Sequence, residues 1–306
     1  MLIIGQKKII RFLEESIKKN TLSHSFIFGG PESLGKTLVA KTLAVSLVYQ
    51  EKPCFSCLFK SDVEEKFYPD IIEIKLLKQK IGIDQIRDLK RNLFLTPFSK
   101  KYKIAIIEQA ERLTEEAANS FLKLLEEAPK TAIIILIVRR LEMLLPTIRS
   151  RCQILRFSLP SKKEVKEFFK KEFELKDEEA EKFYSLSLGR PGLAIRFLKD
   201  KEFLEKTKNQ MREFAKFLEK KEIGVGLETK GPLNLWLLVV RDLILNKLGL
   251  KPTGLLDEAV IKKIERKYTL SELKEMSKKI SRTIFYLEYN VNQNLALENL
   301  ILSLSL

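Results

Sequence analysis

The chain has 306 residues, about two or three times the ~100–200 residues of an ordinary domain, so we expect two or three domains. Its longest apolar run, residues 132–138, is far shorter than the ~20 residues that a membrane-spanning helix needs. Three cysteines exclude a disulfide framework, and a single histidine argues against histidine-based catalysis. The N-terminal residues lack a signal-peptide pattern, so we expect a cytoplasmic protein.

The charge is strongly positive, because 56 Lys and Arg residues outnumber 41 Asp and Glu residues and give a net charge of +15. A charged fraction of 32%, mostly Lys and Glu, is typical of a heat-adapted protein, but this does not explain the imbalance. The positive excess favours a polyanionic partner. Nucleic acid is a better candidate than a membrane surface, since no strongly basic amphipathic segment is evident.

The first half of the chain alternates short β-branched runs with helical periodicity. The runs that predict strands are residues 25–28, 71–74, 103–107, 132–138 and 153–157. Continuous apolar runs of this kind are typical of strands that are buried on both faces of a parallel sheet. Between the third and fourth runs, apolar residues at helical spacing predict a helix over 114–128, with Thr114 as its cap and Pro129 after its end. The pattern predicts an α/β domain with a parallel sheet.

After Pro160 the sequence predicts helices and no strand. Ser161 and Glu164 have the spacing of a capping box. The predicted helices are residues 161–173, 177–188, 194–200, 203–221, 233–247, 255–267 and 270–304, and the turn Gly189-Arg-Pro-Gly192 follows the second of them. We expect three domains, at residues 1–158, 159–202 and 203–306. Trp236 is expected in a helical core or a subunit interface, rather than stacked on a base.

A complete phosphate-loop motif follows the first predicted strand. It consists of Gly30, Pro31, Glu32, Ser33, Leu34, Gly35, Lys36 and Thr37, which match G-x-x-x-x-G-K-[ST]. The glycines let the backbone approach phosphate closely, and the amides at the start of the next helix point at it. Lys36 would reach the β- and γ-phosphates and Thr37 would hold Mg²⁺. The motif predicts binding of ATP and Mg²⁺; the alternative is a chance glycine-rich turn.

Hydrolysis would also need a carboxylate that holds the metal at the end of a neighbouring strand. Glu108 and Gln109 follow the predicted strand 103–107. Glu108 is the candidate Mg²⁺ ligand, although its extra methylene would displace the carboxylate relative to an aspartate. Gln109 cannot act as a base. The alternative is that both are ordinary polar residues at a strand end.

Two segments carry a resemblance to a known family. Residues 111–129, ERLTEEAANSFLKLLEEAP, and residues 144–152, LLPTIRSRC, resemble the signatures of bacterial DNA polymerase III clamp-loader subunits, which are AAA+ ATPases. The phosphate loop and residues 22–29 and 83–87 support the resemblance, which covers about residues 1–200. It implies an AAA+ P-loop domain with a parallel sheet, a small helical lid domain and an all-α C-terminal collar. It also implies that the partners are other clamp-loader subunits (gamma/tau and delta), the sliding clamp and primer–template DNA, with no membrane partner.

The resemblance assigns a role to Arg151. It lies in the Ser150-Arg151-Cys152 motif, whose arginine would be an arginine finger that reaches the γ-phosphate held by a neighbouring subunit. A guanidinium suits this role because it is permanently charged and directs two donors at phosphate oxygens. The alternative is an arginine in a surface salt bridge.

Departures from the family pattern favour a delta-prime-like stator over a gamma/tau-like motor. Glu108-Gln109 replaces the motor's Asp-Glu, and the polar sensor position falls on Val138 or Arg139. The second sensor arginine has only a displaced substitute, Arg190. We therefore expect this chain's own ATP hydrolysis to be weak or absent. The alternatives are an active gamma/tau-like ATPase, a stand-alone P-loop enzyme, or a DNA-binding protein with an incidental loop.

The resemblance also implies a test for zinc, since the family's zinc module uses four cysteines after the phosphate-loop helix. Here Cys54 and Cys57 occupy this position, but Lys60 stands where the next pair would begin. Two thiolates cannot complete a tetrahedral site, so we expect no zinc.

Lys100 and Lys101 are candidate contacts to the DNA backbone, and a solvated charge pair is an equal alternative.

Overall fold

The computed structural model describes residues 3–49, 68–76, 79–99, 101–220, 233–250, 252–254, 256–288 and 291–305. The chain divides into two compact units, each described by itself below. The first comprises Met1–Phe168 with Gly189–Gly192, and the second comprises Phe169–Leu188 with Leu193–Leu306. The three-domain division of the sequence stays a prediction.

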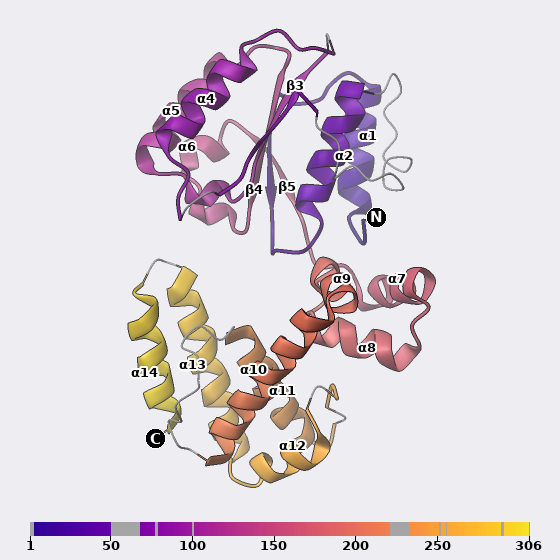
Figure 1. Cartoon of the computed structure of the whole chain (residues 1–306), viewed down its shortest axis with the longest axis vertical. Helices are drawn as coiled ribbons and strands as arrows, with labels where there is room; N and C mark the ends of the chain where they lie inside the picture. The colour runs from indigo at the N-terminus through magenta and orange to yellow at the C-terminus, as the bar shows by residue number, and fades with distance from the viewer. Residues whose placement is uncertain are drawn as a thin grey trace. The chain divides into compact units, whose positions relative to one another are not determined.

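The first unit contains a five-stranded parallel sheet (Figure 1). Its strands are β1 (Ser25–Gly29), β2 (Ile71–Ile74), β3 (Lys103–Ile107), β4 (Ala132–Val138) and β5 (Gln153–Arg156), in the order β2-β3-β4-β1-β5. Among the described residues before 160, the helices are α1 (Lys7–Lys18), α2 (Lys36–Tyr49), α4 (Ile83–Leu93), α5 (Glu115–Glu127) and α6 (Pro146–Arg149), with the short 3-10 turns η1 (Ala110–Arg112) and η2 (Leu141–Met143). All five predicted strands are confirmed.

Helices cover both faces of this sheet, and successive strand residues serve the two faces alternately. On one face α4 and α5 pack against Ile27, Ala105, Ile107, Ile134 and Leu136. On the other face α1 and α2 pack against Phe26, Phe28, Ile104, Ile106, Ile133, Ile135 and Ile137 (Figure 1). Both sets are buried, which is why the strand sequences are continuously apolar.

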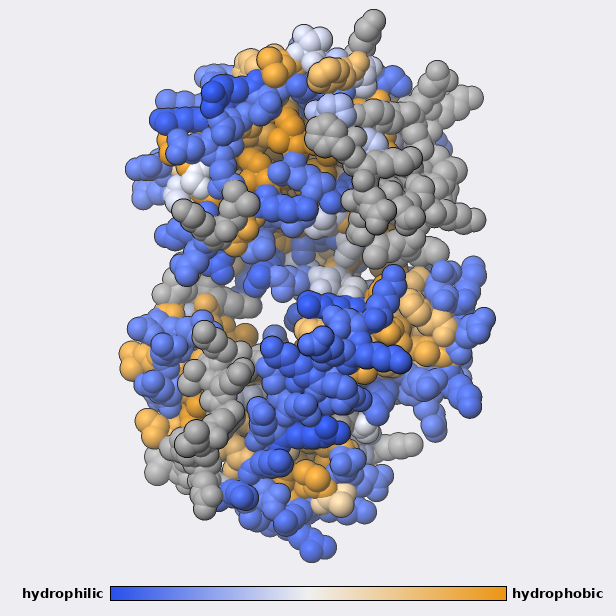
Figure 2. Space-filling view, in the orientation of Figure 1, coloured by the Kyte–Doolittle hydropathy of each residue, from blue (hydrophilic) through white to orange (hydrophobic). Residues whose placement is uncertain are grey.

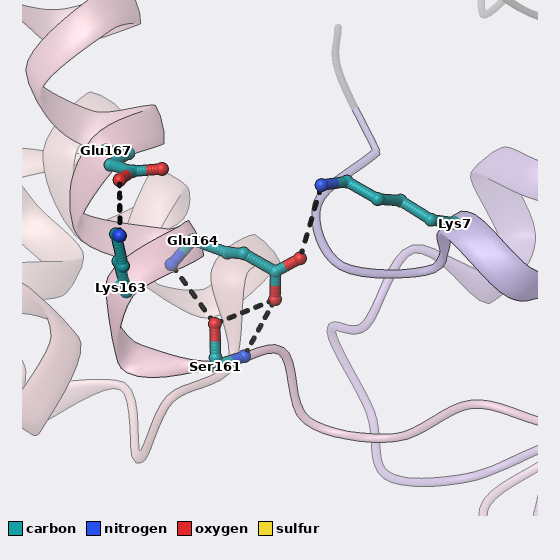
Figure 3. A network of polar contacts seen from close by, with 5 residues as sticks. All are labelled: Lys7, Ser161, Lys163, Glu164 and Glu167. Carbon is teal, nitrogen blue, oxygen red and sulfur yellow. Dashed lines mark hydrogen bonds and ion pairs between the residues drawn. The ribbon is translucent and has the colours of Figure 1, made fainter.

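Two predicted helix starts are confirmed by their caps. The Thr114 hydroxyl accepts a hydrogen bond from the Ala117 amide and begins α5. At α7 (Lys162–Phe173), the Glu164 carboxylate accepts from the Ser161 amide, and the Ser161 hydroxyl accepts from the Glu164 amide (Figure 3). Lys7 lies 3.7 Å from the same carboxylate and connects this cap to the start of α1 (Figure 3). Such reciprocal caps satisfy amides that have no partner within the helix.

After residue 160 the described part of the chain is helical and contains no strand, which confirms the predicted fold class. The remaining helices are α8 (Asp177–Leu186), α9 (Pro191–Lys199), α10 (Lys201–Lys220), α11 (Leu233–Lys247), α12 (Glu258–Glu265), α13 (Leu270–Glu288) and α14 (Gln293–Ser305). Trp236 is buried and stacks on Phe214 with ring centroids 4.4 Å apart, so its predicted core position is confirmed. Hydrophilic side chains cover much of the visible face of each unit (Figure 2).

The predicted single helix over 270–304 is wrong, because α13 and α14 are separate helices. The Asn292 side-chain oxygen accepts hydrogen bonds from the amides of Asn294 and Leu295, at 3.1 and 3.3 Å, and so caps a new helix. Two predicted helix starts are three residues off: α12 begins at Glu258 rather than near 255, and α9 begins at Pro191 rather than 194. Proline is favoured in a first turn, where its missing N–H costs nothing.

Candidate nucleotide site and interface arginine

The phosphate loop lies where two central strands end. Gly29 at the end of β1 is in register with Val138 at the end of β4, and the Gly30 amide donates to the Val138 carbonyl at 3.2 Å. The loop therefore begins at the carboxyl edge of a parallel sheet, and α2 begins within its motif at Lys36. Ligands of open α/β sheets bind at this edge.

The backbone of the loop explains its glycines. Gly30 has a φ of +146°, and a Cβ there would lie 2.3 Å from the Phe157 carbonyl oxygen. The Ser33 carbonyl accepts a hydrogen bond of 2.9 Å from the Gly192 amide, so the Gly189–Gly192 turn lies against the loop. This contact brings the charge of Arg190 close enough to act on Lys36.

Lys36 is buried and turns back onto its own loop. Its Nζ donates to the carbonyl oxygens of Gly30 and Pro31, the second at 2.5 Å. Burial lowers the pKa of Lys36 to about 8; Glu32 and Glu111 oppose this shift, whereas Arg139 and Arg190 add to it. The ammonium is thus held within the phosphate loop. Thr37, the predicted Mg²⁺ ligand, is half-buried in the first turn of α2.

Besides Glu32, the carboxylate that acts on Lys36 is Glu111. The role of Glu108 as a Mg²⁺ ligand stays a prediction. Glu108 is half-buried, and its amide continues the ladder to the Ile74 carbonyl at 3.0 Å. The next residue, Gln109, has a φ of +51° and turns the chain into η1. The turn brings Glu111 to a position where only 2% of its side chain is exposed. Glu111 begins the segment 111–129 that resembles the family signature, but no spacing pattern predicts a role for it.

Arg139 links the end of β4 to the loop. Its Nη2 lies 2.5 Å from Oε1 of Glu32, and its Nε lies 3.9 Å from Oε1 of Glu111. Its amide also donates to Oε1 of Glu111 at 3.3 Å. Val138, the other residue at the predicted sensor position, is buried in the core. Of the two, Arg139 is therefore the residue whose side chain contacts the phosphate loop.

The side chain of Arg151 contacts residues outside the phosphate loop. It lies between α6 and β5, and its side chain is 42% exposed. Its Nε and Nη2 lie 2.9 and 2.6 Å from Oε1 of Glu126 on α5, and its Nη1 donates to the Thr147 carbonyl at 3.1 Å. Burial raises the pKa of the neighbouring Cys152 to about 11, so this cysteine stays a thiol.

Lys100, Cys54 and Cys57 lie outside the described residues. Lys101 is exposed just before β3, and its role at DNA stays a prediction. Within the described ranges, no three His, Cys, Asp or Glu side chains are grouped so that they could hold a metal ion. None of the described helices is both long and apolar enough to cross a membrane.

A family model described as DNA polymerase III, delta subunit matches residues 5–161, about half of the chain. The DNA polymerase III subunit delta' of Haemophilus influenzae is 33% identical over 193 residues, which cover 63% of this chain and 58% of that protein. The delta' subunit of Bacillus subtilis is 36% identical over 155 residues, which cover 50% of this chain and 47% of that protein.

DNA polymerase III subunits named gamma or tau match as well. The tau subunit of Bacillus subtilis is 32% identical over 155 residues, which cover 49% of this chain and 27% of that protein. The matched segments thus span less than two thirds of the length of these curated relatives. A solved structure of a DNA polymerase III gamma subunit-related protein from Thermotoga maritima has 25% sequence identity and a TM-score of 0.42, and covers 97% of this chain and 98% of that chain.

Proposed function

Because the chain belongs to the DNA polymerase III delta-subunit family, we propose that it is a clamp-loader subunit that acts as a delta-prime-like stator. It assembles in the cytoplasm with gamma/tau-type and delta-type subunits and helps to place the sliding clamp on primed DNA. Its AAA+ domain, lid and collar correspond to the predicted division at residues 1–158, 159–202 and 203–306. In this proposal Lys100 and Lys101 contact the DNA backbone.

The observation that carries the proposal is the position of Arg151. Its guanidinium is half-exposed, and its described contacts are with Glu126 and the Thr147 carbonyl rather than with its own phosphate loop. A permanently charged, forked donor on the surface can pair with the γ-phosphate of a nucleotide bound to a neighbouring subunit. The surface salt bridge to Glu126 is a weak competitor, since exposed pairs contribute only about 0–1 kcal/mol.

The chain's own phosphate loop supports nucleotide binding better than hydrolysis. The loop has the predicted backbone, and Lys36 lies within it. Gln109 cannot act as a base, and the position of a motor's polar sensor falls on Val138 or Arg139, neither of which is the expected residue. We therefore propose that ATP with Mg²⁺ binds here and is turned over slowly or not at all.

The proposal is tested by mixing the chain with purified gamma/tau-type and delta-type subunits and sizing the product with and without ATP. A stator joins a defined complex, and the chain alone hydrolyses ATP slowly even with primed DNA. Brisk DNA-stimulated hydrolysis by the chain alone, abolished by Lys36→Ala, would instead identify a gamma/tau-like motor. A monomer with phosphotransfer activity would identify a stand-alone P-loop enzyme.

A further inference from the structure

Arg139 already contacts the phosphate loop. The register of β1 with β4 places it directly after the residue that pairs with Gly29, where the loop begins. Its guanidinium lies 2.5 Å from Glu32, inside the G-x-x-x-x-G-K-T motif. An arginine that reaches a carboxylate on this loop can also reach an anion bound to the loop.

The two carboxylates that contact Arg139 differ in how easily they can move away from its guanidinium. Glu111 is buried, with 2% of its side chain exposed, and it accepts from the Arg139 amide. Its second oxygen, Oε2, is buried and accepts no hydrogen bond from any described residue. The Glu32 side chain, by contrast, is 51% exposed. An exposed glutamate can turn into solvent at little cost, whereas a buried carboxylate needs a cation nearby.

These charges predict what happens when a polyanion arrives. The phosphates of a nucleotide would repel Glu32 and attract Lys36 and Arg139. Glu111 would keep Arg139 at the loop, since leaving would strand a buried carboxylate. The Glu32–Arg139 ion pair would then be exchanged for a phosphate–Arg139 pair.

We propose that Arg139 is a further phosphate-binding residue of this site, and that Glu32 competes with the phosphates of a nucleoside triphosphate for its guanidinium. The proposal rests on the nucleotide binding contained in the proposed function, but it does not depend on the role of Arg151. Glu111 is the residue that positions Arg139, and Glu32 reduces the affinity of the free chain for nucleotide.

The test is the affinity of the purified full chain for ATP with Mg²⁺, measured by calorimetric titration. Arg139→Ala should weaken binding by about tenfold or more, the effect of one charge-assisted hydrogen bond. Glu32→Gln should strengthen binding by up to about fivefold, the effect of releasing an exposed ion pair. In the double variant the Glu32→Gln gain should be smaller than in the parent background, because there is no guanidinium left to release and only the repulsion between Glu32 and the phosphates is removed.

Arg140→Ala removes the same charge from the adjacent position and should leave affinity within about twofold of the parent. Thermal unfolding of each variant separates lost contacts from lost folding. The proposal is overturned if Arg139→Ala binds as tightly as the parent, or if Glu32→Gln strengthens binding equally without Arg139. Either result leaves the proposed function intact, whereas an absence of binding by both the parent and Glu32→Gln also removes its nucleotide part.

Discussion

The protonation of Lys36 should make the affinity of the phosphate loop for ATP depend on pH. Its pKa of about 8 in the free chain, which results mainly from burial, means that near pH 8 a large fraction of molecules lack this proton. Bound phosphate favours the ammonium form, so nucleotide binding should raise this pKa and take up a proton. Affinity for ATP should therefore be nearly constant below about pH 7 and fall as pH rises above 8, by at most about tenfold per pH unit.

Proton uptake can be measured directly by titrating ATP at pH 8 in two buffers that differ in ionisation enthalpy. The observed enthalpies should differ in proportion to the protons taken up, and the difference should shrink at pH 7. Equal enthalpies at pH 8, or an affinity that rises between pH 8 and 9, would contradict the assignment of Lys36 as the phosphate ligand.

Gly30 offers a test of the loop backbone. Gly30→Ala would place a Cβ 2.3 Å from the Phe157 carbonyl at a φ of +146°, so it should destabilise the chain by about 3 kcal/mol and abolish nucleotide binding. Gly82→Ala is the matched control. Gly82 has a φ of −86°, and no atom lies within 4 Å of the position that a Cβ would take there, so its cost should stay within about 1 kcal/mol.

Unfolding in urea, followed by circular dichroism, gives the free energy of unfolding of both variants. Equal losses for Gly30→Ala and Gly82→Ala would contradict this account.

Gly30 and Lys36 could be predicted from the sequence because the loop motif fixes both residue type and spacing. Glu111 could not, because it reaches the site through the left-handed turn at Gln109, a conformation that glutamine does not signal.

At the scale of elements, the start of α14 depends on a single side chain. Asn292→Ala removes the acceptor for two amides of the first turn, so we expect a loss of about 1 kcal/mol, equivalent to about fivefold faster hydrogen exchange at the start of α14. Asn294→Ala, two residues later within the helix, is the control and should not speed exchange, since alanine is the better helix former. Equal exchange in the two variants would show that Asn292 is no cap.

The strands were more predictable than the helix boundaries, for a physical reason. A strand buried on both faces leaves a continuous apolar run, as in Ala132–Val138, and few other structures do. Helical periodicity, by contrast, continues across a break when the next helix resumes in a similar phase. This is why α13 and α14 were predicted as one helix, although Asn292 carries the signal of a new start.

At the scale of the whole molecule, the phosphate loop and Arg151 have separate sets of contacts. In the phosphate loop, Lys36 bonds to the loop backbone, and Arg139 and Arg190 lie close enough to act on its charge. Arg151 contacts α5 and the carbonyl of Thr147 in α6. The Ser150-Arg151-Cys152 motif was enough to single out Arg151 as a candidate functional residue. Its ion pair with Glu126 could not be predicted from the sequence, because the pair depends on how α5 packs beside residues 146–151. The division of labour predicted here is that the chain binds its own nucleotide and promotes hydrolysis of a neighbour's.

The most direct test of that claim is the ATPase rate of the reconstituted complex, with sliding clamp and primed DNA, when this chain carries Arg151→Ala. Sizing should give the same complex as the parent chain, while hydrolysis at the neighbouring site should fall by about 10³-fold and clamp loading with it. Arg156→Ala, a nearby exposed arginine, is the matched control and should preserve both activities. Unchanged hydrolysis and loading by an Arg151→Ala complex that assembles normally would contradict the central claim.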